Sequence, residues 1–365
     1  MRPGVRTCLC LVSVACALLA SGCRSEKDPL ATTPQLALEH LQSGNFKAVY
    51  FNGGAVAGVF AAWPRWLKEE DRAVRSPRVR AMAQAALSPK LFRQLDRQEH
   101  FDAILLCGDP IQFKPLLEHL VQSGDWALDW LDPFSLVYVR GSEETFSAEN
   151  ISTMVRRWDA ASKRMRASAL ARISERLVAA HRKDAALEIL EQAHAVSEEA
   201  AEVWVAEGNF RLARGEMEKA VSAANRALKI DHHNRAAKSV KAQGLYFSRH
   251  FEDAYGLSKE LLDDSPNDPV MMFNHAKISH EVGAIQEEIG ILKKLVRIAI
   301  QEGRSASWFR VYLGQALGMT GKGKEAIAEF DLALADADLP EDQRQTAQNY
   351  RKRIEKMLEP IRITK

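Results

Sequence analysis

Small and apolar residues recur with a fixed period in the C-terminal half of the chain. Five segments align when they start at residues 167, 201, 235, 269 and 307, and the first four starts are 34 residues apart. The eighth residue of each is small: Ser174, Gly208, Ala242, Ala276 and Gly314. The twentieth is Ala186, Ala220, Ala254 and Ala326 in four segments, and Glu288 in the other. This pattern predicts pairs of helices that cross closely, because larger side chains would push their axes apart.

Other residues predict where these helices end. Gly215, Gly283 and Gly321 follow the first helix of their segments, where the chain has to turn and glycine is favoured. Residues 303–306 break the period before the fifth segment, so we expect a longer loop or a kink there. An amphipathic stretch ends the array and predicts a capping helix over 341–358.

Residues 167–340 resemble five tetratricopeptide repeats (TPRs), most clearly in the second segment, "EVWVAEGNFRLARGEMEKAVSAANRALKI". The resemblance implies an all-α superhelix whose first helices line a concave groove. On that implication the side chains that bind a partner are Glu175, Asn209, Gln243, Tyr246, Phe273, Lys277, Trp308 and Gln315. Polar side chains beside aromatic ones suit a protein or an extended peptide, and the groove has no Arg/Lys cluster for an anion.

The N-terminal half has a different pattern, in which short apolar runs alternate with amphipathic stretches. We expect strands over 47–52, 101–107, 126–130 and 134–140, and helices over 34–43, 55–67, 89–99 and 110–124. Residues 69–80 are a charged connector. This order predicts a small α/β sandwich domain over 30–145, followed by a linker helix over 146–166.

Residues 88–140 of this domain resemble the soluble tail domain of membrane glycosyltransferases of the protein-mannosyltransferase type. The shared features are a strand that ends in a loop, a helix, a Gly-x-Trp and a strand pair that ends in Val-x-Val-Arg. Asn52 and Gly58 match the start of that domain. The resemblance implies a fold and no transferase activity, because the catalytic acids of those enzymes lie in a polytopic membrane region that has no counterpart here.

The first residues predict export and lipid attachment. Arg2 and Arg6 precede an apolar stretch over 7–20, which is too short to span a bilayer and is typical of a signal peptide. "LASGC" resembles the lipobox of bacterial lipoproteins, which implies removal of residues 1–22 and acylation of Cys23. Because Arg24 follows in place of the retention signal's Asp, we expect an outer-membrane lipoprotein that faces the periplasm.

Charge and cysteine content exclude several classes of function. Loss of Arg2 and Arg6 with the signal leaves 48 basic and 48 acidic residues, so the chain lacks the basic footprint of a nucleic-acid-binding protein. Cys107 would then be the remaining thiol, with no cysteine to pair with in the same chain.

The same sequence predicts no cofactor and no metal site. Gly53, Gly54 and Gly58 after the first strand lack the G-x-G-x-x-G spacing of dinucleotide-binding domains. The ten histidines lack zinc-ligand spacing. We expect Cys107 to be a small buried hydrophobe, although strand ends in α/β folds do place catalytic residues.

Three hypotheses follow from these patterns. The first is a lipid-anchored periplasmic scaffold without enzymatic activity, which binds a protein or peptide through the groove. The second is an envelope enzyme or sugar-binding protein that uses the loop Cys107–Asp109, with His100 or His119 as the base. The third is a structural subunit that makes its contacts through the α/β domain.

Overall fold

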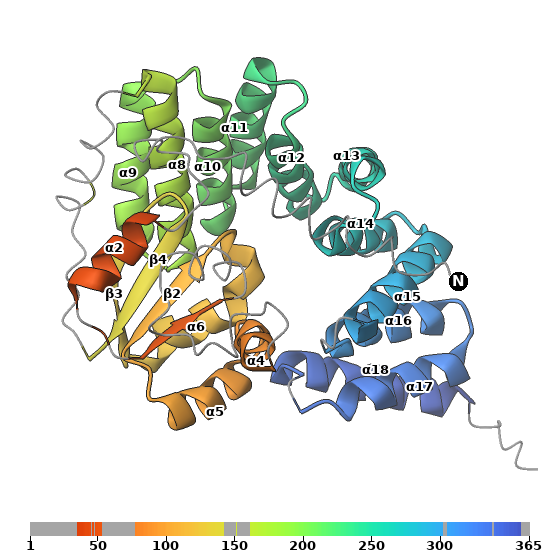
Figure 1. Ribbon diagram of the computed structural model, residues 1–365. Helices are drawn as coiled ribbons and strands as arrows, with labels where there is room; N and C mark the ends of the chain where they lie inside the picture. Colours follow the sequence, from red (N-terminus) through yellow and green to blue (C-terminus); the bar gives the residue numbers. More distant parts are fainter. Residues whose placement is uncertain are drawn as a thin grey trace, which may run out of the picture. The chain divides into compact units, whose positions relative to one another are not determined.

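A computed structural model describes residues 35–44, 46, 48–52, 77–141, 151, 161–301, 305–337 and 339–358 (Figure 1). The chain divides into two compact units, Met1–Ala206 and Glu207–Lys365. Cys23, the glycines Gly53, Gly54 and Gly58, and the helix predicted over 55–67 lie outside the described residues.

A four-stranded sheet organises the first unit, with the order β1-β2-β4-β3. Its strands are β1 (Val49–Phe51), β2 (Ala103–Cys107), β3 (Trp126–Leu131) and β4 (Ser135–Arg140). β1 runs parallel to β2, and β4 is antiparallel to both β2 and β3. Strands are therefore confirmed in all four predicted places, and β3 and β4 form a hairpin. Every residue of β1 and β2 is buried, as the apolar run of β2 indicates.

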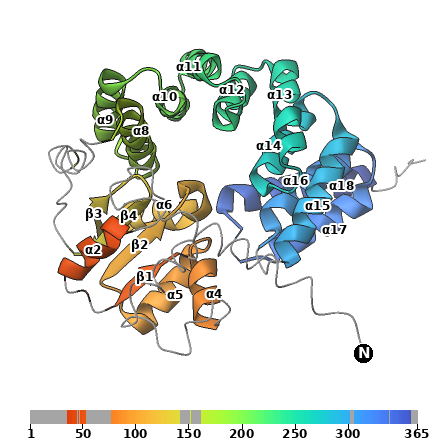
Figure 2. The ribbon, with the colours of Figure 1, turned by 45° about the horizontal axis from the view of Figure 1, so that its top comes forward.

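Helices α4 (Pro77–Ala85), α5 (Pro89–Glu99) and α6 (Lys114–Ser123) belong to the same unit, with a short 3-10 helix over Pro110–Phe113 before α6. Figure 2 shows α4 and α5 close to β1. The hydroxyl of Tyr50 in β1 donates a hydrogen bond to the backbone oxygen of Met82 at 2.7 Å. The ring of Tyr50 lies edge-on against Phe92 of α5, with centroids 5.2 Å apart. This aromatic core fixes the helices on the sheet.

Helix α4 corrects the prediction of a charged connector over 69–80. Val79, Met82 and Ala85 are buried, and they recur every three residues along one side of the helix. Arg78 and Arg80 between them gave the stretch a charged composition, although three apolar side chains suffice to anchor a helix of this length.

β3 contains a β-bulge that the sequence pattern did not predict. The register shifts between Leu128 and Trp130, which leaves Asp129 as the extra residue. His40 of α2 (Gln35–Ser43) stacks on Trp130 at 4.7 Å, and its Nε2 lies 2.6 Å from Oδ2 of Asp129. The bulge thus turns both side chains toward α2.

The C-terminal half is a series of helices (Figure 1). The helices are α8 (Lys163–Ala179), α9 (Lys183–Val196), α10 (Ala201–Ala213), α11 (Met217–Ile230), α12 (Arg235–Phe247), α13 (Phe251–Asp264), α14 (Pro269–Glu281), α15 (Ile285–Gln301), α16 (Ser307–Met319), α17 (Gly323–Leu334) and α18 (Glu341–Leu358). α8 packs against α9, and from α11 to α18 each helix packs against the next along the chain. α10, α12, α14 and α16 begin at the predicted residues 201, 235, 269 and 307, whereas α8 begins four residues before residue 167.

The small residues lie where helices approach closely. A Cβ atom on Gly208 would lie 2.6 Å from a methyl group of Val240, and one on Gly314 would lie 2.8 Å from the ring of Phe330. In the first repeat, the hydroxyl of Ser174 donates to the backbone oxygen of Ala186 at 2.8 Å. The steric reason for the small positions is therefore confirmed.

The turn inside each repeat has the same backbone geometry. The fifteenth residue has a positive φ in every repeat: His181, Gly215, Arg249, Gly283 and Gly321. The next residue donates its backbone N–H five residues back, as in Glu216 to Arg211 at 2.9 Å and Ala284 to Ser279 at 2.8 Å. This is the Schellman motif, which caps the last carbonyl groups of a helix. The role predicted for the three glycines is confirmed.

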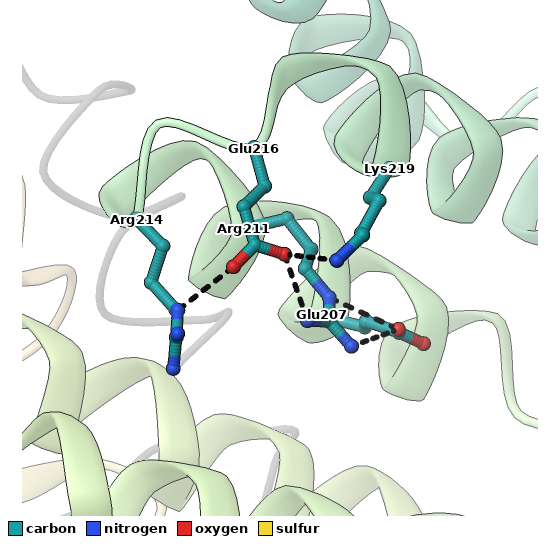
Figure 3. A network of polar contacts seen from close by, with 5 residues as sticks. All are labelled: Glu207, Arg211, Arg214, Glu216 and Lys219. Atoms are coloured by element: carbon teal, nitrogen blue, oxygen red, sulfur yellow. Dashed lines mark hydrogen bonds and ion pairs between the residues drawn. The ribbon is translucent and has the colours of Figure 1, made fainter.

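Charged side chains brace one of these turns (Figure 3). The carboxylate of Glu216 accepts from Arg211 at 3.0 Å, Arg214 at 2.9 Å and Lys219 at 2.9 Å. Arg211 also contacts Glu207 at 3.2 Å. The hydrogen bond from Lys219, followed by that from Arg211, lowers the pKa of Glu216 to about 2. These residues hold the α10–α11 turn through ion pairs that salt would screen.

The helix before the break in the period is longer than its counterparts, and residues 303 and 304, where a longer loop or a kink is expected, lie outside the described residues. α15 has 17 residues, whereas α11 and α13 have 14 each. At the end of the array, α18 packs against α16 and α17 and buries Ala347 and Ile354.

Candidate functional site

The eight side chains assigned to the groove all retain solvent exposure. Glu175 lies on α8 in the first unit, and the other seven lie in the second unit on α10, α12, α14 and α16. The structure brings five of these seven into two adjoining groups. Gln243, Tyr246 and Lys277 line one cavity, and Phe273 and Trp308 belong to an aromatic cluster beside it. Asn209 and Gln315 belong to neither group.

The cavity lies between α12, α13 and α14 and has a volume of about 50 Å³. Its polar lining includes Gln243 and Tyr246 from α12 and Asn274 and Lys277 from α14. Small-molecule sites typically occupy about 300 Å³ or more. The cavity therefore has room for the end of one side chain and is too small for a cofactor.

The aromatic cluster continues from the cavity across α14 to α16. Phe273 lies edge-on to Tyr312 at 5.0 Å and to Phe309 at 5.4 Å between ring centroids. Trp308 lies 6.3 Å from Tyr312 and is 36% exposed. We call these four side chains with Tyr246 the aromatic strip. It offers apolar area and ring edges without carrying charge of its own.

Lys277 joins the cavity to the aromatic strip. Its Nζ lies 5.3 Å from the centroid of the Tyr246 ring and 5.8 Å from that of Phe273. Cation–π contacts of this kind stabilise an ammonium group that has lost part of its water. Burial lowers the pKa of Lys277 below its usual range. Burial also raises the pKa of Tyr246, and the carboxylate of Glu281 nearby adds to that effect.

A buried polar network lies behind the cavity. Ser258 of α13 also lines the cavity, and its Oγ is 2.7 Å from Nδ1 of the fully buried His275. Nε2 of His275 lies 3.4 Å from Glu287, whose other oxygen accepts from Tyr255 at 2.5 Å. Burial lowers the pKa of His275, so its neutral form is favoured. The network links α13, α14 and α15 through polar side-chain contacts.

A second histidine explains the exception at Glu288. Glu288 is 1% exposed, and both its oxygens lie 3.0–3.1 Å from Nδ1 of His280 on α14. This hydrogen bond raises the pKa of His280. Glu288 takes the place of a small residue at the twentieth position, because its buried carboxylate has a hydrogen-bond partner in His280, eight residues earlier.

The strand end at Cys107 does not form an open site. Cys107 is fully buried, and burial raises the pKa of its thiol well above the ordinary value. The side chain of Asn52 accepts from the backbone N–H of Cys107 and donates to its carbonyl oxygen, both at 2.8 Å. A thiol that stays protonated and inaccessible is a poor nucleophile, so the geometry supports the expected structural role.

Arg176 of α8 closes this strand end. Its two terminal nitrogens donate to the backbone oxygens of Gly108 and Pro133, each at 2.8 Å. The side chain is 6% exposed and lies near the carboxylate of Asp132, which accepts from the backbone and hydroxyl of Ser135. The first repeat is thus locked onto the α/β domain.

The two histidines considered as a base lie elsewhere. His100 precedes β2, so the strand separates it from Cys107 by roughly 20 Å. His119 contacts Phe92 at 6.0 Å, and Phe92 stacks on Phe101 at that same far end of β2. Neither candidate base therefore lies beside Cys107.

Sequence reasoning missed two features that the repeat register contained. Arg176 is the tenth residue of its repeat, a position that is buried in the other four as Phe210, Gly244, Ile278 and Ala316. A charged side chain at a buried position indicates that acceptors lie nearby to bind it. Asn274 and Tyr312, at the sixth position of their repeats, also belong to the site, whereas the eight predicted groove residues lie at positions 2, 5, 9 and 12.

None of the helices in the described ranges is both long and apolar enough to cross a membrane. Within the same ranges, no three His, Cys, Asp or Glu side chains gather to hold a metal ion.

No protein-family model matches the chain, and no curated protein matches it either. The resemblance of residues 88–140 to glycosyltransferase tail domains and the lipobox resemblance thus gain no support from these searches.

Solved structures of TPR proteins are similar to the chain. YrrB, described as a TPR protein with an unusual peptide-binding site, has 14% identity and a TM-score of 0.44 over 56% of this chain and 100% of that one. MamA from Desulfovibrio magneticus RS-1 has 18% identity and a TM-score of 0.41 over 46% of this chain and 93% of that one. A TPR protein of Thermus thermophilus has 18% identity and a TM-score of 0.40 over 50% of this chain and 96% of that one. The helix pairs and the turns of this chain itself define its repeat architecture.

Proposed function

We propose that the protein is an interaction scaffold that binds a protein or an extended peptide along α12, α14 and α16. The carrying observation is the aromatic strip, which exposes ring surface next to the polar cavity lined by Gln243, Asn274 and Lys277. Exposed aromatic side chains beside hydrogen-bonding groups are the composition of protein interfaces. The small cavity and the closed Cys107 loop favour this role over an enzyme.

The proposal includes the location predicted from the sequence. Acylation of Cys23 would tether the protein to the envelope, where it would face the periplasm as an outer-membrane lipoprotein. The repeats would then recruit a partner to the membrane surface.

Site-specific photo-crosslinking in cells that express the full chain tests the proposal. A photoreactive amino acid replaces Gln243, Trp308 or Gln315 on the first helices, and matched controls replace the exposed Lys293 or Lys324 on α15 and α17. We expect the first three variants to capture one discrete protein and the two controls to capture none. Equal capture by the control positions, or none at the first three, would contradict the proposal.

A further inference from the structure

Three cations follow the outer side of α5 in the first unit. Lys90, Arg93 and Arg97 are exposed, and they recur at intervals of three and four residues. This spacing places them on one face of the helix, opposite the buried Phe92 that fixes α5 on the sheet. We call these three side chains the basic stripe.

The carboxylates of α5 do not neutralise the basic stripe. Glu99 pairs with Arg78 of α4 at 2.8 Å, and Asp96 accepts from Arg140 at the end of β4. Within the described part of the chain, no carboxylate forms an ion pair with any of the three stripe cations. The stripe therefore presents its full positive charge to solvent.

A surface cavity of about 460 Å³ adjoins the basic stripe between α4 and α5. Arg97 lines it together with three amide side chains, those of Gln84, Gln94 and Gln98. No carboxylate is among the described residues that line it. Guanidinium and amide N–H groups are good donors to phosphate oxygens, and a cavity of this volume has room for a phosphate with a small polar substituent.

Exposed apolar side chains lie next to these donors. Leu87 in the turn before α5 is 39% exposed, and Leu91 in the first turn of α5 is 37% exposed. Leu91 also lines the cavity. Leucine beside Lys and Arg on one surface is the composition of helices that lie on a membrane with anionic lipids.

We infer that this face of α4 and α5 rests on an anionic phospholipid surface, with the cavity receiving a headgroup phosphate. Each Lys or Arg close to such a surface strengthens binding about fivefold, because the surface potential is negative. Leu87 and Leu91 would reach the boundary between headgroups and acyl chains. A second copy of this chain is a poor occupant, since a symmetric pairing of this face would bring like charges together.

The proposed lipid anchor would hold this unit near a bilayer, and this step alone rests on the proposed function. Gln35, where α2 begins, follows Cys23 by twelve residues, and a chain of that length spans at most ~40 Å. α2 packs against β3 and β4 of the same unit. Three cations bind a membrane weakly, so the contact orients the tethered unit and does not replace the anchor.

Co-sedimentation with lipid vesicles tests the inference without the anchor. Residues 24–365 keep every described element and lack both the apolar stretch over 7–20 and Cys23. We expect this chain to bind phosphatidylcholine vesicles with about one third phosphatidylglycerol about tenfold or more tightly than phosphatidylcholine alone, and to lose binding as salt rises. Equal binding to both vesicles would overturn the inference. Equal affinity for soluble polyglutamate would also overturn it, in favour of an acidic protein partner.

Substitutions link vesicle binding to the basic stripe. Replacing all three stripe cations by Gln should weaken binding to the anionic vesicles about tenfold or more. The control removes three exposed charges from α15 and α17 and should leave binding unchanged; its substitutions are Lys293→Gln, Arg297→Gln and Lys324→Gln. Equal losses in the two triple variants would refute the inference.

The apolar part of the face has its own pair of variants. Leu87→Gln combined with Leu91→Gln should weaken binding to the anionic vesicles, whereas Leu332→Gln, at a 54% exposed position of α17, should not. Unchanged binding in the double variant would contradict insertion of these leucines. Crosslinks at Trp308 are read from other residues, so they would support the broader proposal whatever the vesicles show.

Discussion

At the scale of single residues, the fifteenth position of each repeat shows how one backbone requirement is met by different side chains. Gly215, Gly283 and Gly321 adopt φ values of 76–77°, and a Cβ atom there would meet nothing within 4 Å. Arg249 adopts φ of 65° at the equivalent place and pays the left-handed strain of a residue with a side chain.

Arg249→Gly is therefore expected to stabilise the second unit by about 0.5–1 kcal/mol, since glycine removes the strain but raises the entropy of the unfolded chain. Denaturant unfolding of the full chain measures this change. Ser248→Gly is the control: Ser248 has φ of −82°, so glycine there should stabilise nothing. Equal effects of the two substitutions would contradict the explanation.

His275 and His280 give the fourth repeat two opposite responses to pH. Burial lowers the pKa of His275 below 6.5, so its contribution to stability is present above that value and is lost as the pH falls through the folded pKa. The hydrogen bond to Glu288 raises the pKa of His280, so its contribution is present below 6.5 and is lost as the pH rises through the folded pKa.

The two responses can be separated by substitution. His275→Gln should make unfolding of the second unit less sensitive to acid, and His280→Gln should destabilise it mainly at acid pH. Unfolding free energies between about pH 5 and 8 measure both effects. Parallel pH profiles for the two variants would contradict the assignment.

At the scale of elements, Arg176 shows that α8 is part of the first repeat and also packs against the α/β domain. It occupies a core position of the repeat but bonds to the loops after β2 and β3 of the sheet. Arg176→Met would leave the oxygens of Gly108 and Pro133 buried without these donors.

We expect Arg176→Met to destabilise the first unit by about 3 kcal/mol. Hydrogen exchange of residues 103–109 should accelerate with it. Arg172→Met removes the same charge one turn earlier on α8, at a partly exposed position, and serves as the control. If both variants exchange alike, Arg176 is not the residue that closes the strand end.

At the scale of the whole molecule, the proposed arrangement is an anchor, an α/β domain and a repeat array that binds a partner. The anchor is tested by Cys23→Ser, which removes the proposed acylation site. We expect the variant to move from the membrane fraction to the soluble fraction and to lose incorporation of labelled fatty acid. Equal fractionation of variant and parent chain would exclude acylation at Cys23.

The amino-acid sequence by itself determined the elements and the repeat register. Period and steric size act locally: four helices begin at the predicted residues, and small residues lie at the close crossings because nothing larger fits there. Ser88 and Gly124 likewise mark the ends of α5 and α6 through their own backbone and side-chain preferences.

Tertiary structure alone decided which side chains share a site. The cation–π contact of Lys277 with Tyr246 joins residues 31 apart in the sequence, the hydrogen bond of Arg176 to Gly108 spans 68 residues, and the contact of Asp129 at the bulge with His40 spans 89. Such contacts follow from the packing of distant elements, which periodicity does not encode. The sequence therefore predicts which positions lie on one face of the first helices, whereas the contact of Lys277 with the rings of Tyr246 and Phe273 follows only from the packing of the helices.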